Sequence, residues 1–329
     1  MEQTHELAPT HICTKDRQDH IVDWALDMEL HSMLQFTPCD LWQVLQHRSL
    51  WVVGDSQSAD TWVAMICFMR EFWNLTITDR PGNADVEALQ FLKEATSAAP
   101  TVSLEQVKCA ELTAGGGTGR ICHMRVNEVE AELALGMALL QHLSRGTQPI
   151  VVSNWGLWQH RAHIFGAGLQ QLLLMLNTGQ YPFWIWKDTP PQHFQWRNGE
   201  FYPAGHQAPF QCYPHNTTLQ PDKTLVAKPG YEAILTGLWR NTMPYGILHP
   251  HIPYVNTWNL TSMLWDFHRD NYGHGHECSH FCHPGAPQVW IYHIYEKIKA
   301  FAPADVVLPE RFHPSGHMSH RRQQESDAD

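Results

Sequence analysis

Short apolar runs alternate along the chain with stretches in which apolar residues recur at helical spacing. One run covers residues 50–53 and ends at Gly54, and the apolar positions that follow are Trp62, Met65, Ile66, Met69 and Phe72. The run predicts a buried strand, and the spacing after it predicts a helix. We therefore expect a strand, a tight turn at Gly54 and a helix.

Three further apolar runs cover residues 150–152, 183–186 and 254–255. Residues 133–143 and 164–176, on either side of the first of these runs, have the pattern of amphipathic helices. Strands that alternate with helices are typical of a parallel sheet covered on both faces. The sequence therefore predicts an α/β fold around a central, mainly parallel sheet.

The two ends of the chain lack this pattern. Residues 1–38 are polar and rich in histidine, and Pro38 with Cys39 predicts a turn before the ordered pattern begins. Beyond residue 308 the chain is rich in His, Arg and Gln without periodicity. We therefore expect a polar N-terminal extension over residues 1–38, one folded domain over 39–308 and a disordered tail over 309–329.

Charge and hydropathy narrow the classes of partner. The 329 residues include 22 Lys and Arg against 33 Asp and Glu, a formal net charge of −11. A nucleic-acid partner would require a basic face, so we expect none. No apolar run approaches the length of about 18 residues that marks a membrane-spanning helix. We therefore expect no stable membrane span, and residues 1–23 have no pattern of a signal peptide or anchor.

The tripeptide Gly54-Asp55-Ser56 lies between the first predicted strand and its helix. This position puts the Ser56 hydroxyl at the carboxyl end of the sheet and beside a helix N-terminus, where open α/β sheets bind ligands. The alternative is that Asp55 or Ser56 only caps the helix.

Asn154 follows the predicted strand over residues 150–152. Because the ends of parallel strands converge on one crevice, we expect its amide to face the same site as Ser56. An uncharged donor at that place suits an oxyanion. The alternative is an Asx turn that closes the strand.

The segment from His274 to His283 is unusually dense in histidine and cysteine. Glu277 precedes His280 by three residues, and a carboxylate there can orient the imidazole as a general base when the chain between them turns. The same segment offers a zinc site as an alternative. Its members share the parity of one strand face: His274, His276, Cys278, His280 and Cys282.

Taken in order, these blocks resemble the trichome birefringence-like (PC-esterase) group of SGNH-type proteins, whose relatives include sialic-acid O-acetyltransferases. The resemblance covers residues 39–301. Residues 50–62, LWVVGDSQSADTW, are similar to the family's GDS-x-S-R-N block, and VVSNWGLW over 151–158 resembles its strand-end Asn block. WKDTPPQHF over 186–194 resembles W-R-x-x-S-P-x-H-F, and ECSHFCHPGAP over 277–287 resembles D-C-S-H-W-C-L-P-G-V-P.

The resemblance implies a three-layer α/β/α sandwich of the SGNH hydrolase type and a catalytic role for the domain over 39–308. It implies Ser56 as the acyl-carrying nucleophile, His280 as its base and Glu277 as the acid that orients the base. Ser56 and Asn154 are then the oxyanion donors, without any metal or cofactor. Further candidates for substrate binding are Asp55, Trp155, Gly156, Trp186 and His193. The chain departs from the family pattern at Glu277, where the family has Asp, and at Ala59, where plant members have Arg.

The expected function is a serine-dependent O-acyltransferase with an acyl donor, acetyl by resemblance, and a carbohydrate acceptor. The alternatives are a carbohydrate esterase, a glycan-binding pseudoenzyme and a zinc protein that uses residues 274–283. By resemblance we expect the secretory pathway, in the Golgi lumen, or secretion. Five cysteines match family positions and are expected to pair there, with partners that sequence does not specify: Cys39, Cys67, Cys212, Cys278 and Cys282.

Overall fold

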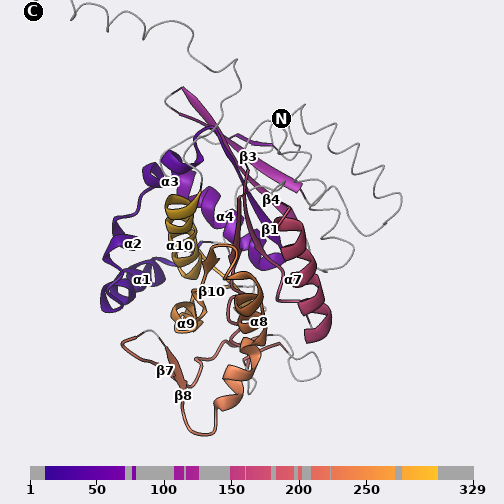
Figure 1. Cartoon of the computed structure of the whole chain (residues 1–329). Coiled ribbons are helices and arrows are strands. Elements are labelled where there is room, and N and C mark those ends of the chain that lie inside the picture. Colours follow the sequence, from indigo (N-terminus) through magenta and orange to yellow (C-terminus); the bar gives the residue numbers. More distant parts are fainter. Residues whose placement is uncertain are drawn as a thin grey trace, which may run out of the picture.

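The structure is a computed structural model of the chain (Figure 1). It describes residues 12–70, 76–78, 107–114, 116–125, 149–159, 161–178, 183–195, 199–201, 209–222, 224–270 and 276–302. The helix expected over residues 133–143 and the tail expected over 309–329 lie outside these ranges. Among the described helices, none combines the length and apolar character that crossing a membrane requires.

A seven-stranded sheet lies at the centre of the described structure, in the order β2-β3-β4-β1-β5-β6-β9. In that order the strands are Thr76–Thr78, Val107–Ala114, Gly117–Arg125, Ser49–Gly54, Ile150–Asn154, Phe183–Lys187 and Tyr254–Val255. Neighbours from β4 to β9 pair in parallel, whereas β2, β3 and β4 pair antiparallel. The predicted α/β fold with a mainly parallel sheet is confirmed. Its antiparallel edge was not predicted.

Helices cover both faces of this sheet (Figure 1). Leu50 and Val52 of β1 face one side, where they pack in a cluster with apolar residues of α3 (Pro38–Leu45), α4 (Ser56–Arg70) and α10 (Ala286–Phe301). Alternate residues of a strand point to opposite faces, which accounts for this division.

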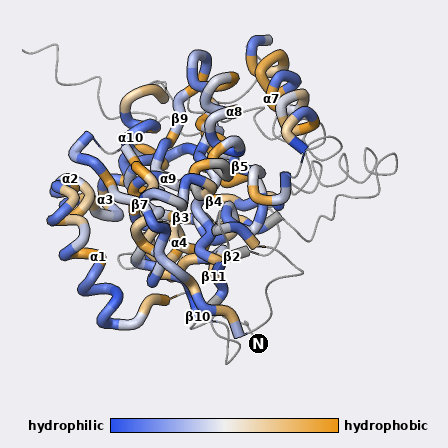
Figure 2. Tube along the Cα trace, turned by 90° about the horizontal axis from the view of Figure 1, so that it is seen from below, coloured by the Kyte–Doolittle hydropathy of each residue, from blue (hydrophilic) through white to orange (hydrophobic). Residues whose placement is uncertain are grey.

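Trp51 and Val53 point to the other face. There they belong to a cluster with residues of α7 (Ala162–Leu176) and α8 (Trp239–Leu248). α7 carries both hydrophobic and hydrophilic residues (Figure 2), as expected of a helix with one face on the core. Because β1 is buried on both faces, its sequence is a continuous apolar run rather than an alternating one.

The smaller elements lie beyond the carboxyl ends of the central strands. They comprise the hairpin β7 (Thr217–Leu219) and β8 (Leu225–Ala227), the 3-10 helices Glu232–Leu238 and Trp265–Phe267, the helix α9 (Trp258–Thr261), and the hairpin β10 (His268–Asp270) and β11 (His276–Phe281). The β10–β11 hairpin carries two of the predicted site residues.

The expected N-terminal extension is wrong for residues 12–38. They form α1 (Lys15–Asp27), α2 (His31–Gln35) and the lead into α3. Trp24 of α1 is buried and belongs to one cluster with Trp290 of α10. The buried stripe of α1 is narrow, with Ile21, Trp24 and Ala25 as its buried residues, so the many charges around it concealed the helical pattern.

Three disulfides join cysteines within the described residues: Cys13–Cys282, Cys109–Cys122 and Cys212–Cys278. The prediction that Cys278 and Cys282 take part in disulfides is confirmed, and each has a different partner. The predicted pairing is wrong for Cys39, whose thiol is exposed, and the three disulfides above do not include Cys67. Disulfides persist in oxidising compartments, so these bridges are compatible with a secreted or lumenal protein.

The Cys13–Cys282 disulfide closes a loop with a sequence separation of 269 residues and attaches α1 to the end of β11. We expect Cys13→Ser to lower the free energy of unfolding by about 3 kcal/mol, because the cross-link restricts the unfolded chain. Urea unfolding under non-reducing conditions measures the change. Cys39→Ser is the matched control and should unfold like the wild type, and an equal loss in both variants would contradict the prediction.

Candidate active site

Ser56 is the first residue of α4, and only Asp55 separates it from the end of β1. Gly54 has φ +151°, and a Cβ there would lie 1.6 Å from the main-chain oxygen of Asn154, so only glycine fits. The Oγ of Ser56 is buried and has no hydrogen-bond partner among the described residues. The position at a helix N-terminus stabilises a negative charge on this oxygen.

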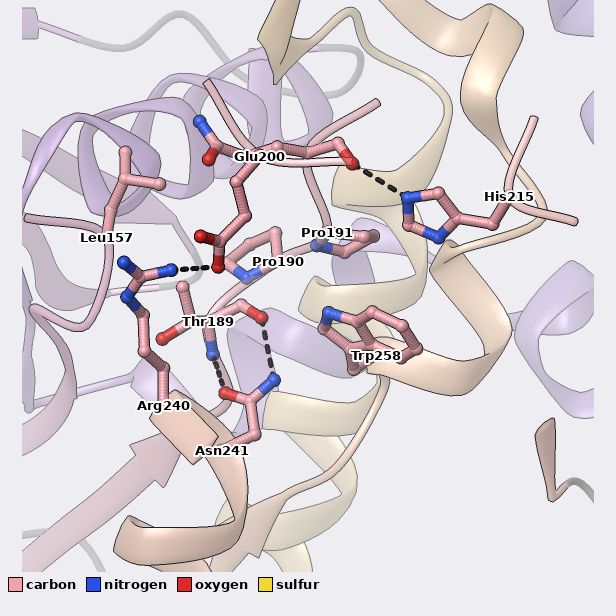
Figure 3. Close-up of a pocket in the computed structure, with 10 residues that line it drawn as sticks. Leu157, Thr189, Pro190, Pro191, Glu200, His215, Arg240, Asn241 and Trp258 are labelled. Atoms are coloured by element: carbon pink, nitrogen blue, oxygen red, sulfur yellow. Dashed lines mark hydrogen bonds and ion pairs between the residues drawn. The ribbon is translucent and has the colours of Figure 1, made fainter. Parts of the chain in front are cut away.

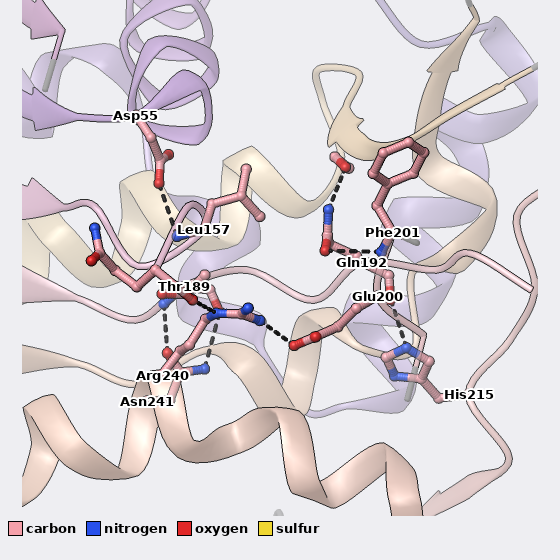
Figure 4. A network of polar contacts seen from close by, with 11 residues as sticks. Asp55, Leu157, Thr189, Gln192, Glu200, Phe201, His215, Arg240 and Asn241 are labelled. Atoms are coloured by element: carbon pink, nitrogen blue, oxygen red, sulfur yellow. Dashed lines mark hydrogen bonds and ion pairs between the residues drawn. The ribbon is translucent and has the colours of Figure 1, made fainter. Parts of the chain in front are cut away.

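Asp55 holds the turn in place. Its carboxylate accepts a hydrogen bond from the main-chain N–H of Gln57 at 2.9 Å. It accepts a second from the main-chain N–H of Leu157 at 3.1 Å (Figure 4). The side chain is fully buried, and this burial raises the pKa of Asp55 to about 6. Asp55 therefore joins the ends of β1 and β5 and does not face a substrate.

Asn154 lies at the end of β5, next to the Ser56 turn, but its amide has other partners. The Nδ2 group donates to the Lys187 main-chain oxygen at 2.8 Å and to the Thr189 Oγ1 at 3.1 Å. An amide nitrogen has two hydrogens, so both are used. The expected oxyanion role of the Asn154 side chain is wrong in this geometry, and the residue instead joins β5 to the segment after β6.

His280 and Glu277 lie together on β11, where the Glu277 Oε2 contacts the Nδ1 of His280. The Gln57 side chain, next to Ser56, donates to the main-chain oxygen of Ser279, next to His280. α4 also packs against β11. The structure thus brings the Ser56 turn and His280 side by side, although they are far apart in the sequence.

Two other acids near the hairpin have basic side chains as partners. The Asp266 carboxylate lies 3.3 Å from the Nδ1 of His20, and the Asp270 carboxylate lies 3.9 Å from Arg17. Both of these partners belong to α1. Glu277 is therefore the acid whose contact suits an orienting role for the imidazole.

The alternative zinc site is not supported by the cysteines. Cys278 and Cys282 are both in disulfides and offer no thiolate ligand. His274 lies outside the described residues. Within the described part of the chain, no three His, Cys, Asp or Glu side chains are grouped as a set of metal ligands.

The expected substrate-binding aromatic residues belong to the core. Trp155 and Trp186 are both fully buried, with ring centroids 4.7 Å apart in an edge-to-face contact. Gly156 lies against Thr189, whose Oγ1 would be 2.0 Å from a Cβ at that position. The expectation that Trp155 and Trp186 bind substrate is therefore wrong. Apolar patterning did not distinguish a cleft tryptophan from a core one.

His193 is also fully buried, so it does not face a substrate. Its Nδ1 lies 2.7 Å from the Nε2 of His268, and its Nε2 donates to the Ser262 main-chain oxygen at 3.0 Å. The Nδ1 of His268 in turn donates to the main-chain oxygen of His280 at 2.9 Å. This chain of imidazoles supports the strand behind His280. Sequence reasoning missed His268, which has no motif around it.

A pocket lies among the segments that follow β5 and β6 and the helices α8 and α9 (Figure 3). Its lining consists of Leu157, Thr189, Pro190, Pro191, Gln192, Glu200, His215, Arg240, Asn241 and Trp258. Arg240 and Glu200 form an ion pair across it. Leu157 connects one wall to Asp55, and the Gln192 side chain donates to the Oγ of Ser279 at 2.6 Å. Two lining residues are therefore hydrogen-bonded to chain neighbours of Ser56 and His280, although neither Ser56 nor His280 lines the pocket.

A scan against protein-family models finds no match to this chain, and a search of curated proteins finds none either.

Because His215 in the pocket wall is buried, we expect the stability of the fold to depend on pH. Burial lowers the pKa of His215 to about 4, below the value near 6.5 expected in the unfolded chain. Between these values the unfolded chain binds a proton that the folded one does not, so stability falls as the pH falls. We expect this residue to destabilise the fold by about 2 kcal/mol at pH 5 relative to pH 7.5.

Urea unfolding of wild type and His215→Gln at pH 7.5 and pH 5 measures this contribution. The variant should lose about 2 kcal/mol less than the wild type between the two pH values. The glutamine amide retains a donor for the Gln192 main-chain oxygen, which His215 contacts at 2.8 Å. A difference between the proteins that is equal at both pH values would contradict the assignment.

Proposed function

We propose that the protein is a serine-dependent O-acyltransferase that acylates a carbohydrate hydroxyl, with acetyl as the acyl group. The observation that carries the proposal is the position of Ser56. Its buried Oγ lies at the N-terminus of α4, beside the strand on which Glu277 contacts His280. A nucleophile, a base and an acid that orients the base are the parts that acyl transfer through serine requires.

In the first proposed step, the Nε2 of His280 accepts the proton of Ser56 as the Oγ attacks the carbonyl carbon of the acyl donor. The tetrahedral intermediate then collapses, and His280 protonates the leaving group. This step leaves an acyl ester on Ser56. Glu277 holds the imidazole by its Nδ1 and stabilises the imidazolium that forms.

In the second proposed step, His280 accepts the proton of a sugar hydroxyl, which attacks the acyl-serine. Collapse of the second intermediate returns the proton to the Ser56 oxygen and releases the acylated sugar. Since the Asn154 amide is occupied, we assign the oxyanion to the main-chain N–H of Ser56, where the helix dipole adds a favourable field.

The proposal extends to the fold type and compartment. Helices on both faces of a mainly parallel sheet, with the serine directly after β1, support a three-layer sandwich of the SGNH type. The three disulfides of the described residues support work in the secretory pathway. A carbohydrate esterase is the second candidate, because water at the acyl-serine would give hydrolysis with the same residues.

The nucleophile is tested by labelling with a fluorophosphonate probe and by turnover of an aryl acetate. We expect the wild type to react in both assays. Ser56→Ala should lose labelling and most turnover, because it lacks the reacting hydroxyl and the remaining serines, which are not activated, do not react with the probe. Ser58→Ala is the matched control: the Ser58 Oγ donates to the Asn154 main-chain oxygen at 3.0 Å, so the folded variant should still be labelled. Equal labelling of wild type and Ser56→Ala would exclude the serine mechanism.

The acid is tested with three single variants that replace a carboxylate by an amide. We expect Glu277→Gln to lower turnover by roughly 10⁴-fold, because the amide favours the wrong imidazole tautomer, whereas Glu277→Asp keeps a measurable fraction. Asp266→Asn and Asp270→Asn should remain near wild type, since these acids contact α1 residues. Near wild-type turnover in Glu277→Gln, with collapse in either control, would move the role away from Glu277.

A further inference from the structure

Asp60 lies on the same helix as Ser56 and one turn further along, so the two side chains share a face of α4. Its side chain is only 5% exposed. A buried carboxylate is unfavourable unless a charge partner compensates it. Burial raises the pKa of Asp60 to about 7. Above that pH the carboxylate is ionised and requires a cation nearby.

The cation comes from the other half of the site. Arg269 is the central residue of β10, the partner strand of β11. One of its terminal nitrogens, Nη1, lies 3.5 Å from the Asp60 carboxylate. The other, Nη2, lies 3.9 Å from the Oε2 of Glu277, the oxygen that contacts His280. The planar guanidinium therefore bridges the helix of the nucleophile and the acid of the base.

We propose that Arg269 is a positioning residue for the acid–base pair: by bridging Asp60 and Glu277 it sets where His280 lies relative to Ser56 and how strongly His280 holds a proton. This inference rests on the proposed function for its kinetic consequences. Arg269 acts through its contact with Glu277. It is therefore not a catalytic residue.

The charges define the direction of each effect. The positive charge of Arg269 partly compensates the negative charge of Glu277. The Glu277 carboxylate is then less able to stabilise an imidazolium at His280. Removal of the guanidinium should raise the pKa of His280. Removal of the Asp60 charge should do the reverse only above about pH 7, where that carboxylate is ionised, because the guanidinium then acts on Glu277 alone. A residue that only supports the hairpin would lower stability without moving this pKa.

A second arginine provides a matched control. Arg17 of α1 donates to the main-chain oxygen of His268 at 2.9 Å, and its other terminal nitrogen lies 3.9 Å from Asp270. It thus supports the same short strand, β10. Among the described residues its polar contacts are with His268 and Asp270, not with Glu277. The charge change in Arg17→Gln equals that in Arg269→Gln.

The experiment measures kcat and KM for an aryl acetate from pH 5 to 9 in wild type, Arg269→Gln, Arg269→Lys, Asp60→Asn and Arg17→Gln. We expect Arg269→Gln to lower kcat by about 10-fold with little change in KM, as loss of a second partner of an orienting group does in metal sites. The acidic limb of its pH profile should move up by about one unit. Arg269→Lys should keep the wild-type limb in part, and Arg17→Gln should leave it in place. Asp60→Asn removes a carboxylate that is ionised only above about pH 7, so it should change kcat above that pH and leave the acidic limb in place.

The same shift is read directly from the protein by NMR titration of the His280 imidazole, assigned by comparison with His280→Gln. This reading needs no turnover. A wild type that is inactive and unlabelled, with a raised pKa of His280 in Arg269→Gln, would reject the proposed function and retain the positioning role. An unchanged pKa of His280 in folded Arg269→Gln, or the same shift in Arg17→Gln, would overturn the positioning role.

Discussion

The carboxyl ends of the paired strands β1 and β5 lie so close together that only glycine fits at residue 54. The Asp55 main-chain N–H and the Ser58 hydroxyl both reach the Asn154 main-chain oxygen across this contact, at 3.3 and 3.0 Å. The Asp55 carboxylate adds a second connection through Leu157. These bonds define the turn between β1 and α4. The location of Ser56 at the carboxyl edge of the sheet follows from them.

The second half of the site is held by covalent bonds. Cys278 and Cys282 lie on either side of His280, and their disulfides attach β11 to Cys212 in one loop and to Cys13 at the N-terminal side. β11 belongs to a two-stranded hairpin, which is marginal on its own in water. The two bridges and the packing against α4 therefore place the imidazole on a short element that the central sheet does not contain.

Around the candidate site, buried acidic side chains are compensated by a basic side chain that is distant from them in the sequence. Asp55 and Asp60 are buried acids whose pKa values burial raises, to about 6 and about 7. Burial of imidazoles acts in the opposite direction and lowers the pKa of His193 and His215. Burial therefore favours the neutral form of these two histidines. Arg269 supplies a positive charge to this region from the β10 strand.

The sequence by itself determined the local elements and the chemistry-bearing blocks. The apolar runs at residues 50–53, 150–152, 183–186 and 254–255 are strands, because a strand buried on both faces reads as a continuous apolar run. Glu277 and His280 are in contact, as their short spacing suggested, although the residues between them belong to the strand β11 and not to the expected turn. Such features depend on neighbours in the chain.

Tertiary structure decided which of these groups are available and what surrounds them. The sequence indicated the Asn154 amide as an oxyanion donor, but in the structure both of its hydrogens are donated to Lys187 and Thr189. α1 looked like part of an extension until a buried tryptophan and a disulfide joined it to the core. Arg269 has no motif, and its role follows only from two carboxylates that the fold brings to it. Hydrogen-bond saturation, burial and ion pairing depend on residues distant in sequence, and a single sequence does not specify which distant residues meet.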